Sequence, residues 1–261
     1  MNAEDLRKKL FKAMNAPAPS IDRLFTSTKS QRYEAESWEA YFEERRVIQP
    51  TGSTDQFVVY CSLRSKGPLF VFHHGAGHAA LAFALVAQSI RERFPDEISL
   101  LAYDCRGHGG TCTAQEYDLS LDTLATDLGH VIAEIYQPES VPDTVLVGHS
   151  MGGAVVSHAA YHGMVTNLLG LVVIDIVEGN AMAALGKIKR FCDSRPQRFP
   201  TMSDAIQWFL ESGSIVNPAS AQVSVPPLLI QVPEEQTMQY TWRTKLEASE
   251  KYWPGKVEKF S

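Results

Sequence analysis

The stretch 148–153, Gly-His-Ser-Met-Gly-Gly, constrains the fold of this 261-residue chain more than any other feature. The apolar residues at 144–147 predict a strand before it, and Ala-Val-Val at 154–156 predicts the start of a helix after it. A Gly-x-Ser-x-Gly motif between a strand and a helix is typical of a nucleophile elbow, a sharp and strained turn. Small flanking residues are needed there because the helix leaves the strand at close range. The motif therefore predicts that Ser150 is a catalytic nucleophile.

Strands and helices alternate on both sides of this motif. Apolar strands separated by helices are typical of a parallel sheet that is covered on both faces. The pattern therefore predicts an α/β fold with a mostly parallel sheet. The expected strands are 56–63, 68–73, 98–103, 143–147 and 171–174, and the expected helices are 79–94, 120–136 and 151–163.

The two ends of the chain differ from this middle region. Residues 1–36 are mostly polar and are predicted to be a mobile tail, with a partner-binding helix as the alternative. Residues 37–178 are predicted to form the core. The strand–helix repeat stops after Asp175, so residues 179–261 are predicted to form a helical cap over the sheet. Within the cap we expect helices at 181–192, 201–213 and 241–252, and a loop at 217–236, which carries four prolines.

Composition argues against several classes of protein. A net charge of −6 and a pI near 5.8 disfavour nucleic acid or an anionic membrane surface as the main partner. No apolar run reaches the length of a membrane span, and the acidic amino terminus predicts no secretory signal. The four cysteines show neither a C-x-x-C pair nor a metal-binding spacing. This pattern favours reduced thiols and a protein of the cytosol or nucleus, without a metal.

A second segment, 74–78 (His-Gly-Ala-Gly-His), ends another predicted strand. Ligands bind at the carboxyl ends of parallel strands, so this loop should lie near the serine. In enzymes with such an elbow, the amide after the serine, here Met151, and an amide from this loop form the oxyanion hole. Ala76 is the first candidate for the second donor, followed by Gly77, and His74 is expected to brace the loop by hydrogen bonding. The alternative is a tight turn with no chemistry.

Two aspartates follow predicted strands. Asp175 ends the strand at 171–174, where a carboxylate is well placed to orient a catalytic imidazole. The alternative for Asp175 is a helix N-cap. Asp104 also ends a strand, but its neighbours Arg106 and His108 predict a structural ion pair and a turn instead of a catalytic role.

The expected general base is missing from its usual place. In proteins with this elbow the histidine follows the serine and the acid, yet the last histidine here is His162, one helix beyond Ser150. His158 and His162 lie roughly 12 and 18 Å along that helix, at about 1.5 Å per residue, which is out of reach. His149 is expected to point into the core. His78 is the one plausible stand-in.

Several further segments are more particular than the elbow. They are Val-Ile-Asp-Ile-Val-Glu-Gly-Asn-Ala-Met at 173–182, Ser-Arg-Pro at 194–196, Ala-Ile-Gln-Trp at 205–208, Tyr-Thr-Trp-Arg at 240–243 and Glu-Lys-Tyr-Trp at 250–253. With the elbow, they resemble the protein phosphatase methylesterase family of the α/β-hydrolase superfamily. The resemblance implies an α/β-hydrolase fold in which Ser150 and Asp175 are triad members. It also implies an oxyanion segment in which Ala76 replaces a usual glycine.

The resemblance further implies a function. Members of this family remove the methyl ester from the carboxyl-terminal leucine of the protein phosphatase 2A catalytic subunit, which would be the partner, and they need no cofactor. Their catalytic histidine follows two more strands beyond the cap. The chain is therefore expected to be truncated before that histidine, to be impaired in hydrolysis, and to leave 171–174 as an uncovered apolar edge.

Two other functions remain open at the level of the sequence. One is a non-catalytic protein that binds the phosphatase, which the lack of a histidine after His162 favours. The other is a general hydrolase of small esters or lipids. The segments around Asp175, Trp208 and Trp242 argue against this second alternative.

Overall fold

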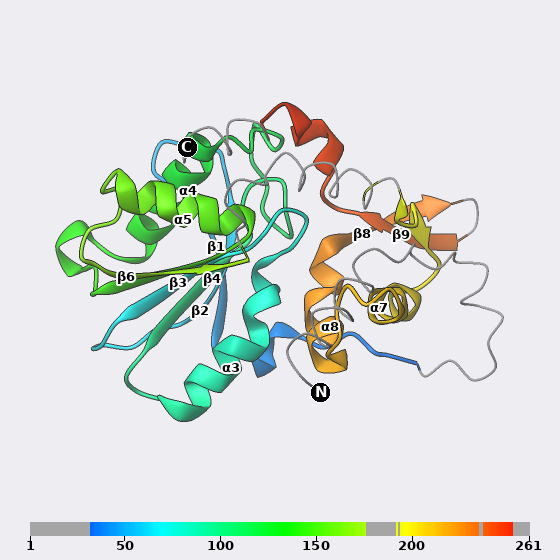
Figure 1. Cartoon of the computed structure of the whole chain (residues 1–261), viewed down its shortest axis with the longest axis horizontal. Helices are drawn as coiled ribbons and strands as arrows, with labels where there is room; N and C mark the ends of the chain where they lie inside the picture. The colour runs from blue at the N-terminus through cyan, green and yellow to red at the C-terminus, as the bar shows by residue number, and fades with distance from the viewer. Residues whose placement is uncertain (1–31, 176–191, 193, 235–236, 253–261) are drawn as a thin grey trace, which may run out of the picture.

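A six-stranded sheet forms the centre of the computed structural model, which describes residues 32–175, 192, 194–234 and 237–252 (Figure 1). The strand order is β1-β2-β4-β3-β5-β6, in which β1, β2 and β4 pair antiparallel and β4, β3, β5 and β6 run parallel. The prediction of a mostly parallel α/β sheet is confirmed, and β1 was not expected. The strands are β1 Glu44–Ile48, β2 Phe57–Ser62, β3 Leu69–His73, β4 Ser99–Tyr103, β5 Thr144–His149 and β6 Leu168–Ile174.

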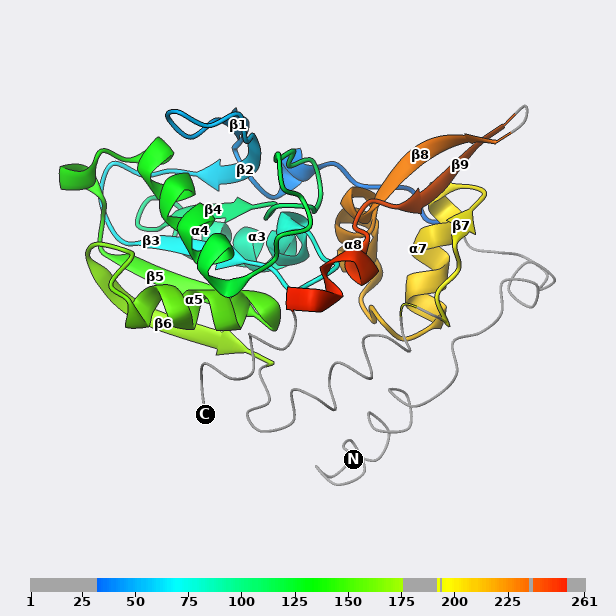
Figure 2. The same ribbon diagram turned by 90° about the horizontal axis from the view of Figure 1, so that it is seen from above.

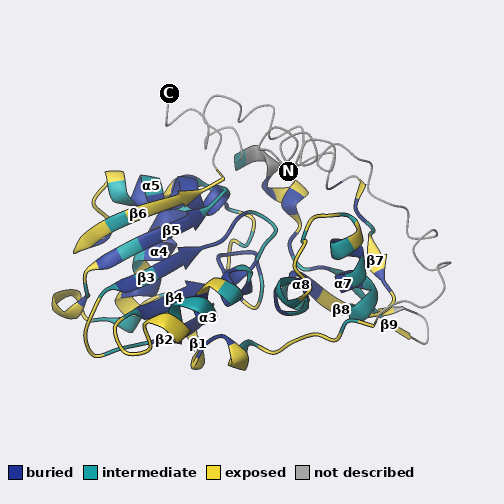
Figure 3. Cartoon of the chain, turned by 60° about the horizontal axis from the view of Figure 1, so that its bottom comes forward, coloured by how far each residue is buried: buried dark blue, intermediate teal, exposed yellow. Residues whose placement is uncertain are grey.

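Helices cover both faces of this sheet, as Figures 1 and 3 show. Successive residues of a strand point to opposite faces, so Val71 packs into one apolar cluster and Phe72 into the other. Burial on both faces explains why these strands are almost continuously apolar. The first face is covered by α4 (Leu121–Ile135) and α5 (Met151–Tyr161), and the second by η2 (Ala80–Phe83) and α3 (Ala84–Arg93).

The cap is not purely helical, which corrects the prediction. It contains a three-stranded sheet in the order β7-β9-β8, together with α-helices and 3-10 turns. Figure 2 shows η5 lying between the core and the rest of the cap. The elements are β7 Arg198–Phe199, α7 Met202–Glu211, α8 Pro218–Ser224, η4 Pro226–Leu228, β8 Leu229–Glu234, β9 Thr237–Trp242 and η5 Leu246–Tyr252.

Two predictions for the cap were wrong for identifiable reasons. The stretch 217–236 is not a loop, because Asn217 caps α8 and Pro218 takes the first helical position, where proline is tolerated. The stretch 241–252 is not one helix, because its first residues complete β9 and pair with β8. The helix expected from residue 201 is confirmed, with a capping box between Thr201 and Asp204. The helix expected at 181–192 lies almost entirely outside the described residues.

Aromatic side chains form the core of the cap. Trp208 lies with its ring centroid 5.9 Å from that of Phe199 and 6.1 Å from that of Trp242. The guanidinium of Arg195 lies 4.4 Å from the centroid of Trp242, on its outer side. Edge-to-face aromatic pairs and a stacked arginine stabilise a small core beyond the area that they bury.

Arg243 fastens this cap to the loop that follows β4. Its guanidinium donates to the carbonyl oxygens of Gly109 and Thr111 and forms an ion pair with Glu116 at 2.7 Å. The hydroxyl of Thr244 donates to the carbonyl of Gly107 at 2.9 Å. The cap is therefore held over the carboxyl ends of the strands, where ligands bind in such sheets.

The prediction of a mobile tail over residues 1–36 is wrong for its carboxyl-terminal residues. The amide of Tyr33 donates to the hydroxyl of Ser203 at 3.1 Å, and the amide of Glu36 donates to the carbonyl of Gln222 at 3.0 Å. These residues lie on the cap. Residues 1–31 lie outside the described part of the chain.

Strand β6 is an exposed apolar edge. None of its residues is buried in the described structure, and Val172 and Val173, which face opposite sides, are 43% and 42% exposed. This agrees with the uncovered edge expected at 171–174. An edge strand of this kind exposes the backbone amides and carbonyls of its outer side to other chains. Among the described residues, no helix has the length and apolar character needed to cross a lipid bilayer.

Two helical glycines differ sharply in their surroundings, which yields a test of the packing. A Cβ on Gly152 in α5 would lie 2.1 Å from the carbonyl oxygen of His73 in β3. A Cβ on Gly129 in α4 would have Met164 as its nearest neighbour, at 3.8 Å. We expect Gly152→Ala to lower the free energy of unfolding by about 3 kcal/mol or more, because backbone must move.

The matched control is Gly129→Ala, which is expected to raise the free energy of unfolding by up to about 1 kcal/mol, since alanine favours helix. Urea unfolding of the two variants beside the parent chain measures both changes. Equal effects of the two substitutions would contradict the close packing of α5 against β3.

Candidate active site

Ser150 occupies a strained turn between β5 and α5. Its backbone has φ 51° and ψ −115°, a combination that residues other than glycine rarely adopt and that costs about 1–3 kcal/mol. A Cβ on Gly148 would lie 2.3 Å from the carbonyl oxygen of Gly152, so both glycines of the motif are required. The amide of Ser150 donates to the carbonyl of Ile174 at 2.9 Å, which places the serine at the carboxyl end of the sheet.

The loop 74–78 lies directly against this turn. A Cβ built on Gly75 would lie 3.3 Å from the Cβ of Ser150 and 2.9 Å from Nδ1 of His149. The contact leaves no room for a side chain at position 75. The structure therefore brings together the two segments that the sequence analysis assigned to one site.

The three amides that were predicted as oxyanion donors differ in whether they are free to bind an oxyanion. Among the described residues, the amides of Met151 and Ala76 have no hydrogen-bond acceptor. The amide of Gly77 donates to Nε2 of His108 at 2.9 Å. Gly77 is thereby removed as the alternative donor, and Met151 with Ala76 remains. Met151 is the first residue of α5, where the helix dipole adds a favourable potential for negative charge.

Asp175 follows β6 beside the elbow. Its φ is 54°, and the residue before it, Ile174, is paired in the sheet with His149. Burial lowers the pKa of His149, and the negative charge of Asp175 partly opposes this. The triad role of Asp175 stays a prediction, because residues 176–191 lie outside the described part of the chain.

His149 does not point into the core as expected. It is half-buried, and its ring lies edge-on to the ring of His78, with the centroids 5.4 Å apart. Burial, with a smaller effect of His149, lowers the pKa of His78 to about 4. The imidazole of His78 is therefore neutral near pH 7 and a weak base.

None of the eight histidines, all of which lie in the described residues, is hydrogen-bonded to the hydroxyl of Ser150. His158 is committed elsewhere, since its Nε2 lies 2.8 Å from a carboxylate oxygen of Asp122 in α4. The ring of His162 packs on that of His158, with centroids 4.3 Å apart. The site as described places Ser150 beside the amides of Met151 and Ala76, which were predicted as oxyanion donors, with no histidine bonded to the serine hydroxyl.

Asp104 has the structural role that the sequence analysis expected, by a different contact. Its carboxylate accepts hydrogen bonds from the amides of Ala80 and Gly110 at 2.8 and 2.9 Å. Burial outweighs these bonds and raises the pKa of Asp104 to about 6. The expected ion pair of Arg106 is formed with Asp127, at 2.6 Å.

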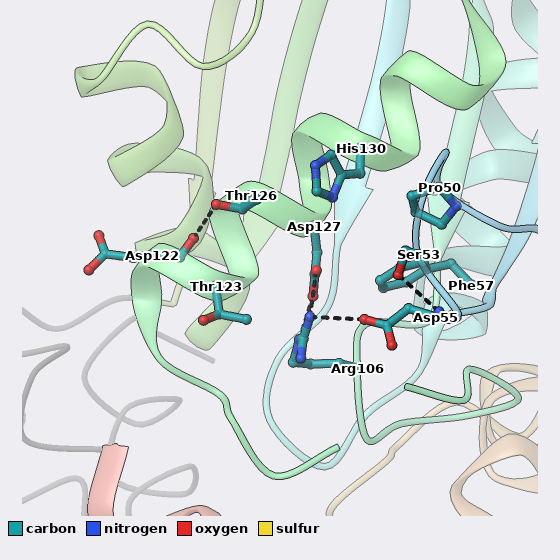
Figure 4. A pocket seen from close by; sticks show the side chains of 10 residues that line it. All are labelled: Pro50, Ser53, Asp55, Phe57, Arg106, Asp122, Thr123, Thr126, Asp127 and His130. Carbon is teal, nitrogen blue, oxygen red and sulfur yellow. Dashed lines mark hydrogen bonds and ion pairs between the residues drawn. The ribbon is translucent and has the colours of Figure 1, made fainter. Parts of the chain in front are cut away.

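That ion pair lines a separate pocket of about 270 Å³ beside α4, shown in Figure 4. Arg106 lies between Asp127 and Asp55, whose carboxylate is 3.6 Å away. His130 lines the same pocket. Among the described residues that line it, none belongs to the elbow or to the loop 74–78. Three aspartates, Asp55, Asp122 and Asp127, line this pocket beside one arginine, and the close contact of Arg106 with Asp127 is typical of a buried structural ion pair.

The cap adds an apolar wall that the sequence analysis missed. Leu246 and Cys192 are buried and pack against Ala76. A Cβ on Gly77 would lie 3.0 Å from Cδ1 of Leu246. No local pattern identifies Leu246, because its role depends on how the cap lies on the loop 74–78. Among the described residues, no group of three or more histidine, cysteine or acidic side chains is arranged to hold a metal.

Comparison with known proteins places this site in a family. A model described as the alpha/beta hydrolase family matches residues 70–257. Protein phosphatase methylesterase 1 of Gibberella zeae is 42% identical over 228 residues, which cover 83% of this chain and 56% of the relative. A probable protein phosphatase methylesterase 1 of Caenorhabditis elegans is 37% identical over 257 residues, covering 98% of this chain and 67% of the relative. The chain belongs to the protein phosphatase methylesterase family.

Solved structures agree with this chain in fold. An E-2-(acetamidomethylene)succinate hydrolase superposes with a TM-score of 0.62 at 18% identity, over 82% of this chain and 74% of the other. The thioesterase domain from the curacin biosynthetic pathway gives a TM-score of 0.57 at 19% identity, over the same shares. This member of the methylesterase family spans little more than half the length of its Gibberella zeae relative.

The buried carboxyl of Asp104 makes stability depend on pH. Its pKa is about 6 in the folded chain and 3.8 for an ordinary aspartate, so the folded state binds more protons between those values. This contribution to stability is present below about pH 4 and is lost as pH rises to about 6, on the order of 3 kcal/mol in total.

Asp104→Asn removes the ionisation. We expect the stability difference between the parent chain and the variant to shift in favour of the variant as pH rises from 4 to 6, and to be constant outside that window. Urea unfolding at a series of pH values measures this difference. A difference that stays constant from pH 3.5 to 7 would contradict the buried environment of Asp104.

Proposed function

We propose that this chain carries the site of a serine carboxylesterase that removes the methyl ester from the carboxyl-terminal leucine of a protein phosphatase 2A catalytic subunit. The observation that carries the proposal is the strained Ser150 beside two unpaired amides, in a chain whose relatives are named protein phosphatase methylesterase 1. The phosphatase is the proposed partner. None of the four cysteines, all of which lie in the described residues, forms a disulfide, which supports a location in the cytosol or nucleus.

In the proposed reaction, the hydroxyl oxygen of Ser150 attacks the ester carbonyl and gives its proton to a base. The carbonyl oxygen becomes an oxyanion, which accepts hydrogen bonds from the amides of Met151 and Ala76. The tetrahedral intermediate collapses, methanol leaves with the proton from the base, and an acyl-enzyme remains. Water then attacks the acyl-enzyme and releases the free carboxylate. Asp175 orients the base and stabilises its cation.

Among the described residues, no histidine is hydrogen-bonded to the hydroxyl of Ser150 to serve as the base. His78 is the nearest candidate, but a pKa of about 4 makes it a weak proton acceptor at neutral pH. We therefore expect slow turnover by a polypeptide of these 261 residues. Loss of one triad member leaves the contributions of the oxyanion hole and of substrate binding, about 10³–10⁴-fold over water.

A non-catalytic phosphatase-binding protein is the second candidate function. The observation that favours it is that no histidine is bonded to Ser150 among the described residues. The apolar wall of Leu246 and Cys192 beside Ala76 has the apolar character that a leucine side chain would require of its surroundings in either case. A general hydrolase of small esters remains the third candidate, and the likeness to solved hydrolase and thioesterase structures supports the fold alone.

The test uses a phosphatase tail peptide that ends in leucine methyl ester. We expect the parent chain to bind this peptide and to hydrolyse it slowly, and Ser150→Ala to bind it equally well without hydrolysis above the uncatalysed rate. Mass spectrometry follows the loss of the methyl group, and calorimetry measures binding.

The matched control is Ser157→Ala in α5, which is expected to change neither quantity. Neither binding nor hydrolysis of the ester peptide, with short acyl esters cleaved instead, would contradict the proposed substrate. Fast turnover of the peptide would contradict the expected lack of a strong base.

A further inference from the structure

Two buried histidines connect the loop 74–78 to the loop that follows β4. His108, in the second loop, accepts a hydrogen bond at Nε2 from the amide of Gly77 in the first, at 2.9 Å. His74, in the first loop, accepts a hydrogen bond at Nε2 from the amide of Cys105 in the second, at 3.0 Å. The two contacts are reciprocal, because each loop contributes one imidazole and one backbone amide.

The backbone partners fix the tautomer of both rings. An amide nitrogen can only donate, so Nε2 of each histidine is an unprotonated acceptor. The proton must then lie on Nδ1. In His108, Nδ1 lies 2.8 Å from the carbonyl oxygen of Arg106, and in His74 it lies 2.8 Å from the carbonyl oxygen of Gly75. Both nitrogens of each ring thus have a backbone partner, and Nδ1 of His108 also lies 3.2 Å from Sγ of Cys105.

Two hydrogen bonds to the carbonyl of Gly75 determine where the amide of Ala76 points, one from Nδ1 of His74 at 2.8 Å and one from the amide of His78 at 3.1 Å. The carbonyl of Gly75 and the amide N–H of Ala76 belong to one peptide plane, and in a trans peptide they point in opposite directions. Because the Gly75 carbonyl is held toward His74, the Ala76 N–H is held away from it. The bond from Gly77 to His108 fixes the next peptide plane in the same way.

Protonation of either ring would break this arrangement. An imidazolium carries protons on both nitrogens, so Nε2 would face an amide N–H as a second donor. Both rings are fully buried, and their centroids lie 5.0 Å apart. Burial first, and then the neighbouring histidines, hold the pKa of His74 well below its usual value.

We propose that His74 and His108 are a reciprocal pair of positioning residues that fixes the Ala76 amide as the second oxyanion donor. The name oxyanion donor rests on the proposed esterase function, whereas the orientation of the amide does not. Neither residue touches the reacting atoms. His74 acts through its Nδ1 proton on Gly75, and His108 acts through its Nε2 lone pair on Gly77.

The proposal predicts opposite substitution patterns at the two positions. The amide of asparagine takes the place of Nδ1, and the amide of glutamine takes the place of Nε2. His74→Asn keeps the donor to Gly75 and His108→Gln keeps the acceptor for Gly77, so both should leave the Ala76 amide unchanged. His74→Gln and His108→Asn should displace it. A packing role alone would favour glutamine, the closer match in size, at both positions.

Nitrogen-15 NMR of the full chain is the decisive experiment. Histidine labelling of the parent chain should show His74 and His108 as neutral Nδ1–H tautomers from pH 5 to 8. The backbone amide resonance of Ala76, assigned with Ala76→Gly, should stay in place in His74→Asn and His108→Gln and move in the other two variants. An Nε2–H tautomer at either ring would overturn the proposal. So would the finding that the same substitution, asparagine or glutamine, leaves the Ala76 resonance in place at both positions.

The functional arm uses an alkyl boronic acid, which forms a tetrahedral adduct with a serine and places an oxygen in the oxyanion hole. We expect its affinity to fall about 100-fold in His74→Gln and His108→Asn, as for loss of one oxyanion donor, and to be nearly unchanged in the other two variants. An equal fall in all four variants would contradict the pair. If the parent chain does not bind the boronic acid, the esterase function fails, while the tautomers and the Ala76 resonance still decide the pair.

Discussion

The close approach of α5 to the central strands is the constraint on which the site depends. Gly152 touches the backbone of β3, and Gly148 touches the backbone of Gly152, so neither position has room for a Cβ. With the helix this near the sheet, the chain must turn within one residue, and Ser150 takes up the strain at φ 51°. The same approach places the first turn of α5 beside the loop 74–78. The nucleophile and its two unpaired amides therefore follow from backbone packing.

The parts of the structure that local patterns encode were predictable. Glycine spacing predicted the elbow, and apolar strands between helices predicted the sheet, because both depend on neighbours in sequence. The cap was predicted only in part, since four prolines in 217–236 suggested a loop, yet Pro218 begins α8 after the Asn217 cap. The choice between Ala76 and Gly77 depends on His108, which is 31 residues from Gly77 in sequence. No local pattern contains a contact between two loops.

The exposed edge strand β6 and Ser150, whose hydroxyl has no bonded histidine, lie at the same border of the sheet. The carbonyl of Ile174 in β6 accepts the amide of Ser150, and Asp175 follows immediately. A reactive serine needs a base on this side, next to the carboxylate that would orient it. Two imidazoles near this border, those of His149 and His78, pack on one another, and neither is hydrogen-bonded to the serine hydroxyl. This border of the sheet thus combines an exposed apolar edge with a serine whose hydroxyl has no bonded histidine.

We propose that Ser150 is assembled as a nucleophile and that, among the described residues, no base is hydrogen-bonded to its hydroxyl. The most direct measurement is the rate of fluorophosphonate labelling at Ser150, followed by mass spectrometry, with and without added imidazole and beside Ser150→Ala. We expect slow labelling at Ser150, which imidazole accelerates and which Ser150→Ala abolishes. Rapid labelling without imidazole that is lost in His78→Gln would show a base inside the chain. No labelling of the folded chain at any imidazole concentration would contradict the assembled site itself.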